Sequence, residues 1–324
     1  MKAYKGFDKN LQCLGYRYEI GRTFEEDDAS LYSKGFHACE YPLDCFSYYT
    51  PADSRYCEVE IEDNGERNSE DTKVCGKKIR IGAEVGIKEL IFAASAYVKA
   101  HCTNTEQGQD RCCLTGGDRS ALTGGNSSAL TGGDKSALTG GDKSALTGGD
   151  KSALTGGDWS ALNGGYKSAL NGGDWSALTG GDRSALNGGN WSALNGGDKS
   201  ALTGGNWSAL TGGDRSALTG GDKSALTGGD RSALTGGDRS ALTSGYKSAL
   251  TGGDSSALTG GDWSVVYGGE NAKVRAGIGS VLALQYWVDG EFFGVKCEAV
   301  DGKKIKANTW YRLDKAGRFI EAEE

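Results

Sequence analysis

Four tryptophans recur at one fixed interval and are the first candidates for a functional role. Trp159, Trp175, Trp191 and Trp207 are each separated by sixteen residues. Large apolar side chains at a constant interval predict an exposed stripe on one sheet, and such stripes mark interaction sites. Self-association, a partner protein and a flat polysaccharide are the competing uses, and we favour self-association. The alternative without a ligand is a ladder of stacked rings that support one another.

A second set with the same interval is basic, and we expect it on the opposite sheet. Nearly every member follows an Asp or a Tyr, so carboxylates interleave with the cations. A track for nucleic-acid phosphates needs a net positive surface, and these Asp residues largely cancel it. We therefore expect a solvated face of alternating charge, worth about 0–1 kcal/mol per pair, and no nucleic-acid partner. The set comprises Arg119, Lys135, Lys151, Lys167, Arg183, Lys199, Arg215, Arg231 and Lys247, followed by Trp263.

The third candidate is a cleft near Tyr4, His37 and Tyr49 in the non-repetitive N-terminal part. The segments around these residues, followed by an alternating strand at Arg55–Ile61, resemble the element order of ADP-ribosyltransferases. That resemblance implies a residue after the first strand that holds a dinucleotide, and a late catalytic Glu. The chain offers no matching Glu, and no Ser-His-Asp or phosphate-loop pattern. We therefore expect no enzyme and no cofactor, with an ADP-ribosyltransferase-like domain as the alternative.

An octad, Leu-Thr-Gly-Gly-Asp-x-Ser-Ala, repeats without a slip from Leu114 to Val266 and must position the first two sets. Gly-Gly-Asp is typical of a turn, because Gly accepts positive φ and Asp can bond its own backbone. The remaining x-Ser-Ala-Leu-Thr predicts a short strand. Side chains alternate along a strand, so Leu and Ser point inward while x, Ala and Thr point outward.

The x position indicates how many octads make one coil. Four consecutive Trp fall in one series of alternate octads, and the basic residues nearly fill the other. Coils of two octads stack the Trp residues directly, whereas coils of three scatter them. We therefore predict a mainly β fold: a two-sheet parallel β-solenoid of sixteen-residue coils. Roughly ten coils at ~4.8 Å each make a rod about 50 Å long.

The repeat resembles the octapeptide of bacterial ice-nucleation proteins, as in Gly117–Thr123, and similar octads occur in uncharacterised proteins of bacteriophages and gut bacteria. The ice-nucleation resemblance implies a sixteen-residue solenoid with inward Ser and Leu and an outward Thr-x-Thr ladder. This chain carries Ala-Leu-Thr or Ala-Leu-Asn instead. Lys, Arg or Trp at x, beside the Ala and Thr ranks, also disturbs a flat ice-binding face. Ice binding or nucleation is thus an alternative function, and we expect it to be absent.

Three parts follow along the chain: an α+β domain at 1–103, the solenoid at 104–284 and an antiparallel β cap at 285–324. The first contains strands near Ala3–Phe7, Tyr16–Gly21 and Gly35–Cys39, a helix opening near Pro42, strands at Arg55–Ile61 and Lys77–Ile81, a polar loop at 63–72 between them, and a helix at Glu84–Ala100. Asp289-Gly290 and Asp301-Gly302 predict hairpin turns in the cap. Its expected core is Trp287, Phe292, Phe293, Trp310, Tyr311 and Phe319.

Composition and charge indicate whether the protein is a membrane, a secreted or a metal-binding protein. The 324 residues carry a net charge of −7 and no apolar run long enough for a transmembrane helix. The N-terminus lacks the apolar core of a signal peptide. We expect a protein of the cytoplasm, in a bacterium or a phage-infected cell. The nine Cys include no Cys-x-x-Cys pair, so free, buried thiols are expected rather than a metal site.

Overall fold

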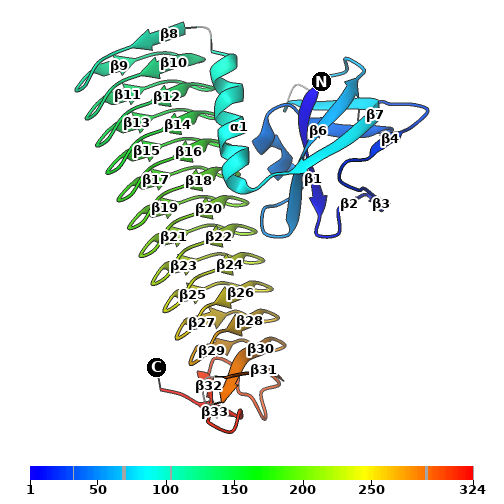
Figure 1. The fold of residues 1–324 in the computed structure, drawn as a ribbon, viewed down its shortest axis with the longest axis vertical. Coiled ribbons are helices and arrows are strands. Elements are labelled where there is room, and N and C mark those ends of the chain that lie inside the picture. Colours follow the sequence, from blue (N-terminus) through cyan, green and yellow to red (C-terminus); the bar gives the residue numbers. More distant parts are fainter. Residues whose placement is uncertain (32, 68–70, 103, 289–290, 324) are drawn as a thin grey trace.

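The computed structural model describes residues 1–324 except 32, 68–70, 103, 289–290 and 324. It shows a rod of two parallel sheets, an N-terminal domain against one side of the rod, and a small antiparallel cap at the C-terminal end (Figure 1). Residues sixteen apart are register partners, as in Leu178 with Leu194. The predicted sixteen-residue coil is therefore confirmed, and a coil of three octads is excluded.

Each of the two long sheets contains 13 described strands, the antiparallel cap strands included, and their bounds are as follows. The even sheet comprises β8 (Asn104–Gln107), β10 (Ser120–Thr123), β12 (Ala137–Thr139), β14 (Ala153–Thr155), β16 (Ala169–Asn171), β18 (Ala185–Asn187), β20 (Ala201–Thr203), β22 (Ala217–Thr219), β24 (Ala233–Thr235), β26 (Ala249–Gly252), β28 (Val265–Gly268), β30 (Val281–Val288) and β31 (Glu291–Ala299). The odd sheet comprises β9 (Cys113–Thr115), β11 (Ala129–Thr131), β13 (Ala145–Thr147), β15 (Ala161–Asn163), β17 (Ala177–Thr179), β19 (Ala193–Asn195), β21 (Ala209–Thr211), β23 (Ala225–Thr227), β25 (Ala241–Thr243), β27 (Ala257–Gly260), β29 (Lys273–Ala276), β32 (Tyr311–Leu313) and β33 (Phe319–Glu321).

The core of the rod consists of the inward Leu and Ser residues, as the alternation predicts. The octad Leu residues from Leu122 to Leu258 are at most 2 % exposed and form one continuous cluster. The buried Ser at each octad Ser position from Ser120 to Ser264 bonds backbone groups, because a buried hydroxyl without a partner is costly. The Ser184 hydroxyl, for example, donates to the carbonyl of Gly165 at 3.2 Å and accepts from the backbone N–H of Ser168 at 3.2 Å.

The turn differs from its prediction in two ways. The x residues lie in the turn with left-handed backbone, as at Trp175 (φ 61°) and Lys199 (φ 58°), and not on the strand. The positive φ expected at the repeat glycines thus falls on x instead. Left-handed backbone costs an L-residue about 1–2 kcal/mol, and an inter-coil bond offsets this. The backbone N–H of x donates to the Asp carbonyl of the next coil, as Lys199 does to Asp214 at 2.8 Å.

The repeat glycines are needed for close approach between coils. A Cβ on Gly133 would overlap the Oδ1 atom of Asp118 in the preceding coil. That oxygen accepts the backbone N–H of Asp134 at 2.9 Å. The octad Asp therefore bonds the next coil and not its own backbone, which corrects the prediction.

The N-terminal domain is a small closed antiparallel sheet. Strand β1 (Lys2–Asp8) pairs with β5 (Phe36–Cys39) and β6 (Ser54–Asp63), and β7 (Lys73–Glu84) pairs with both and closes the ring. The expected strand at Tyr16–Gly21 is shorter, and a strand at Thr23–Glu25 was not expected. The helix near Pro42 is a 3-10 helix. The remaining elements are β2 (Gln12–Cys13), β3 (Tyr16–Arg17), β4 (Thr23–Glu25), η1 (Pro42–Ser47) and α1 (Ile87–Ala100). The polar loop begins after Asp63, and its residues 68–70 lie outside the described chain.

The cap is antiparallel as predicted, but its predicted core is partly wrong. Phe292 and Phe293 in β31 are 54 % and 71 % exposed. Val300, Ile305 and Tyr311 instead pack against the last coil of the rod. The open end of that coil is covered by the loop after β31 and not by the hairpin of β30 and β31. Trp287, Trp310 and Phe319 are half-buried.

The two predicted hairpin turns of the cap have different outcomes. Asp289-Gly290 lies outside the described residues. Asp301-Gly302 opens a loop instead of a hairpin, with the Asp301 carboxylate accepting the N–H groups of Lys303 and Lys304. The hairpin of the described cap that joins β32 to β33 turns at Asp314–Arg318.

A pair of glycine substitutions tests the close approach. We expect Gly133→Ala to destabilise the protein by about 1–3 kcal/mol, because the new methyl displaces the Asp118 carboxylate. Gly117→Ala, at the same octad position in the first full octad, has open space around its Cβ and negative φ, so its effect stays within about 0.5 kcal/mol. Urea unfolding measures both. Equal effects would contradict the assigned role of the Gly-Asp contact.

Candidate functional site

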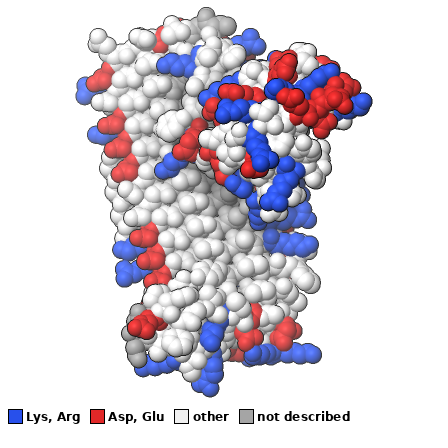
Figure 2. All heavy atoms as spheres, turned by 45° about the vertical axis from the view of Figure 1, so that its right-hand side comes forward, with Lys and Arg blue, Asp and Glu red and all other residues white. Residues whose placement is uncertain are grey.

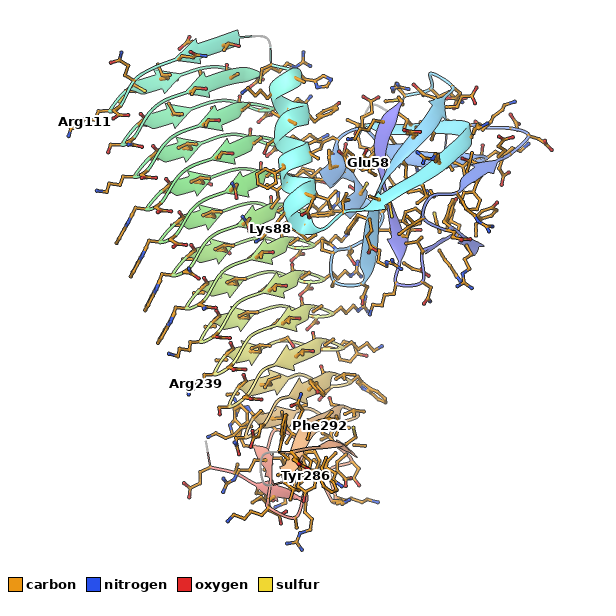
Figure 3. All side chains as sticks on the ribbon, viewed as in Figure 1. Glu58, Lys88, Arg111, Arg239, Tyr286 and Phe292 are labelled. Carbon is orange, nitrogen blue, oxygen red and sulfur yellow. The ribbon has the colours of Figure 1, made fainter. Side chains whose placement is uncertain are left out.

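The four tryptophans form one continuous stack along an edge of the rod. Adjacent ring centroids lie 4.8–4.9 Å apart with interplanar angles of 2–3°. The predicted contact between Trp159 and Trp175 is confirmed. The predicted position on a sheet face is wrong, because x lies at the turn. The stack belongs to the Trp edge, which we define as the x residues that precede the odd strands. Figure 3 labels Arg111 and Arg239 of this edge, which project away from the N-terminal domain.

The stack presents ring edges to solvent. Each interior indole has both faces against its neighbours, and the ammonium of Lys223 lies 4.2 Å from the ring centroid of Trp207. The four side chains are nevertheless 46–57 % exposed. Together they expose roughly 500 Å² of aromatic surface, the size of the largest apolar patch on a typical soluble monomer, which is often functional.

The basic series occupies the opposite edge, the basic edge, which we define as the x residues that precede the even strands. In the middle of the rod face visible in Figure 2, below the N-terminal domain, charged side chains are absent and lie along the two sides. Part of the basic edge is not solvated, contrary to expectation. Lys167 is 3 % exposed, and its ammonium lies 2.7 Å from the fully buried carboxylate of Asp44. Lys151 lies 3.8 Å from the same carboxylate.

Helix α1 and η1 lie between the closed sheet of the N-terminal domain and the rod (Figure 1). Together with the contact of Asp44 and Lys167 they form the surface through which the N-terminal domain docks on the rod, which we call the docking surface. The hydroxyl of Tyr41 donates to the carbonyl of Lys167 at 2.6 Å. The apolar face of α1 lies on the even sheet, where a row of Ala residues leaves room for a helix. These outward Ala residues are thereby buried, whereas their counterparts on the odd sheet stay exposed. The contacting residues are Leu90, Ile91, Ala94 and Val98 of the helix, and Ala153, Ala169, Ala185 and Ala201 of the sheet.

Sequence reasoning missed Asp44, and the octad of its partner departs from the repeat. In the octad of Lys167 the Asp is replaced by Tyr166, so Lys167 has lost its usual preceding carboxylate. The Tyr166 hydroxyl instead bonds Arg183, whose guanidinium also reaches Ser47. The same replacement occurs at Tyr246, before the exposed Lys247, so this departure from the repeat does not by itself identify the docking point.

The predicted cleft residues Tyr4, His37 and Tyr49 line one cavity of about 330 Å³ in the N-terminal domain. Burial raises the pKa of both tyrosines. Burial, reinforced by the charges of Lys73 and Lys5, lowers the pKa of His37, so the imidazole is neutral at pH 7. Lys5 and Glu26 also line the cavity and were not singled out from the sequence.

The thiols and the carboxylates provide no metal site among the described residues. No group of three or more His, Cys, Asp or Glu side chains is placed to hold an ion there. All nine Cys are free. The expectation of burial holds for Cys39, Cys45, Cys57 and Cys75, whereas Cys113 and Cys297 are exposed.

The outer face of the odd sheet bears on the ice-binding alternative. Its Ala and Thr residues, such as Ala209 and Thr211, form exposed parallel ranks. The x side chains lie at the edges, so the argument that they disturb this face is wrong. The absence of a Thr-x-Thr ladder and the short rod still favour no ice nucleation, which stays a prediction for a droplet-freezing assay.

Comparison with known protein families gives a match for the N-terminal part of the chain. Residues 1–93 match the model of a domain of unknown function, DUF7666, and the match ends within α1. No curated protein and no solved structure matches the chain. Within the described residues, no helix is both long and apolar enough to cross a membrane.

The buried ion pair yields a prediction about docking. We expect Asp44→Asn to cost about 3–5 kcal/mol, because it leaves the Lys167 ammonium buried without a countercharge. Hydrogen exchange should rise in α1 and in the even strands beneath it, while the odd strands stay protected. Lys247→Met, at an exposed position of the same edge, is the matched control. Unchanged exchange in α1 after Asp44→Asn would contradict this docking role.

Proposed function

We propose that the protein is a non-enzymatic structural rod of the cytoplasm that pairs with a second copy of itself through the Trp stack. The observation that carries the proposal is the uninterrupted row of four half-exposed indoles on the edge opposite the docked domain. One edge of the rod already binds a part of its own chain. The other keeps a large aromatic surface in solvent.

The ring geometry argues against a polysaccharide. Sugars bind aromatic side chains by lying on the ring face, and the faces of Trp175 and Trp191 are covered by neighbouring indoles. One face of Trp207 is covered by Lys223. The exposed indole edges suit a protein surface, because Trp offers apolar area with little loss of side-chain entropy.

The order of residues along the Trp edge favours a second copy over an unrelated partner. Lys143 and Lys223 border the stack symmetrically, and the stack lies near the middle of the rod. A two-fold axis perpendicular to the rod, between Trp175 and Trp191, sets four indoles against four. Such an isologous contact needs one self-complementary surface, the commonest way in which soluble chains pair.

Charges beside the stack fit the same arrangement. The two-fold axis brings Lys143 of one copy near Lys223 of the other, and the octad residues Asp142 and Asp222 stand next to these cations. Each Lys can therefore meet a carboxylate of the opposing copy. Stable interfaces bury about 800 Å² per partner, so the stack provides the centre of the contact and the flanking coils its rim.

Removal of the stack tests this function. We expect light scattering to give twice the 33.8 kDa of one chain for the wild type at high concentration. The variant Trp159→Lys, Trp175→Ser, Trp191→Lys, Trp207→Ser should give the mass of one chain. Both replacements already occur at x on this edge, as Lys143 and Ser127, so the coil accommodates them.

The matched control is Trp263→Ser. Trp263 is an equally exposed indole at an x position of the basic edge. Its replacement should leave the dimer intact. A wild type that stays monomeric over the whole concentration range, or a quadruple variant that still dimerises, would refute the proposal.

A further inference from the structure

Lys5 occupies a position that the strand pattern assigns to the core. In β1 the side chains of Ala3 and Phe7 lie on the inner face of the closed sheet, and both are fully buried. Lys5 lies between them on the same face and is 6 % exposed. Lysine is almost never buried to this extent without a partner charge.

The ammonium of Lys5 is incompletely satisfied. It donates to the carbonyl of His37 at 2.8 Å, and it lies 5.6 Å from the ring centroids of Phe7 and Tyr18. Among the described residues no carboxylate lies within ion-pairing distance of it. An ammonium has three donors, and a buried charge without a counterion is costly. The group is therefore prepared for an anion that the chain itself does not supply.

The free side of this ammonium faces the cavity that Tyr4, His37 and Tyr49 line. The cavity lies beside the place where β1 and β5 pair, at Tyr4 and Cys39. Its walls are rich in aromatic rings, with Tyr16, Tyr18, Phe36, Tyr48 and Tyr49 among the lining residues.

The charges around the cavity favour an anion. Lys73 is a second lining cation, and Glu26 is the carboxylate among the lining residues. The pKa of His37 is lowered by burial first and then by Lys73 and Lys5. The two lysines thus act on the same space, with the neutral imidazole as a hydrogen-bonding group at its side.

We infer that this cavity binds a small molecule with one anionic group on a flat apolar body. The anion, a carboxylate or a phosphate, pairs with the ammonium of Lys5, and the flat body packs between the aromatic walls. Ligand sites of this size are mostly apolar, with a few placed polar groups that orient the ligand. The inference concerns the N-terminal domain and is independent of the pairing through the Trp stack.

Calorimetry with the full-length protein and four probes tests the inference. Phenyl phosphate and benzoate carry the two candidate anions on a flat ring, phenol is the uncharged counterpart, and inorganic phosphate lacks the ring. We expect phenyl phosphate or benzoate to bind at least tenfold more tightly than phenol and than inorganic phosphate, and the better of the two identifies the anion. Failure of both to bind, or equal binding of phenol, would overturn the inference.

Substitution of Lys5 provides the second test. Lys5→Met keeps the length of the side chain and should weaken the better anionic probe at least tenfold, with phenol unaffected. Lys9→Met, at an exposed lysine outside the cavity, should leave the affinity unchanged. Undiminished affinity in a folded Lys5→Met protein overturns the inference. If Lys5→Met does not fold, the comparison of charged and uncharged probes on the wild type decides.

Discussion

The contact between an octad Asp and the glycine of the next coil is the constraint on which the rod depends. The Asp Oδ1 atom accepts a backbone N–H sixteen residues on, as at Asp118 and Asp134, and the space it occupies excludes a Cβ on the adjoining Gly133. Parallel strands of three residues form few ladder bonds by themselves. The Asp and Ser side chains add bonds between coils, the Asp bond being absent where Tyr166 and Tyr246 replace the octad Asp, and so hold the register.

The same turn determines where variable residues appear. Because x adopts left-handed backbone at the corner, its side chain points away from both sheets. Successive x residues on one edge are then neighbours across coils, as the 4.9 Å ring spacing of Trp159 and Trp175 shows. Substitution at x changes an edge without disturbing the Leu and Ser core. One edge has thereby become a docking surface through Lys167, and the other an aromatic ridge.

Periodicity made much of the rod predictable from sequence. Because Leu and Ser recur every eight residues on the same face of a strand, the pattern predicts that both point into the core. The run of Trp at every second octad fixed the length of the coil at sixteen residues. The corner position of x was not predictable from the same pattern, because positive φ at Trp, Lys or Arg is uncommon. Gly next to Asp suggested the usual explanation of a flexible turn, whereas steric room for a neighbouring carboxylate was the real requirement.

The non-repetitive parts were less predictable because their contacts join distant residues. The pairing of Asp44 with Lys167 spans 123 positions, and the Tyr166 that precedes Lys167 does not reveal it, because Tyr246 precedes the exposed Lys247 in the same way. The N-terminal residues Tyr4, His37 and Tyr49 did come together in one cavity. Lys5 escaped notice, because alternation along β1 groups Ala3, Lys5 and Phe7 on one face but does not show that this face is the inner one.

Small-angle X-ray scattering across a dilution series tests most directly whether the rod pairs side by side through its Trp edge. The stack lies near the middle of the rod, so antiparallel pairing should enlarge the cross-section as concentration rises while the longest dimension stays near that of one rod. A cross-section that stays that of one rod at every concentration, or a particle that doubles in length, would contradict the account.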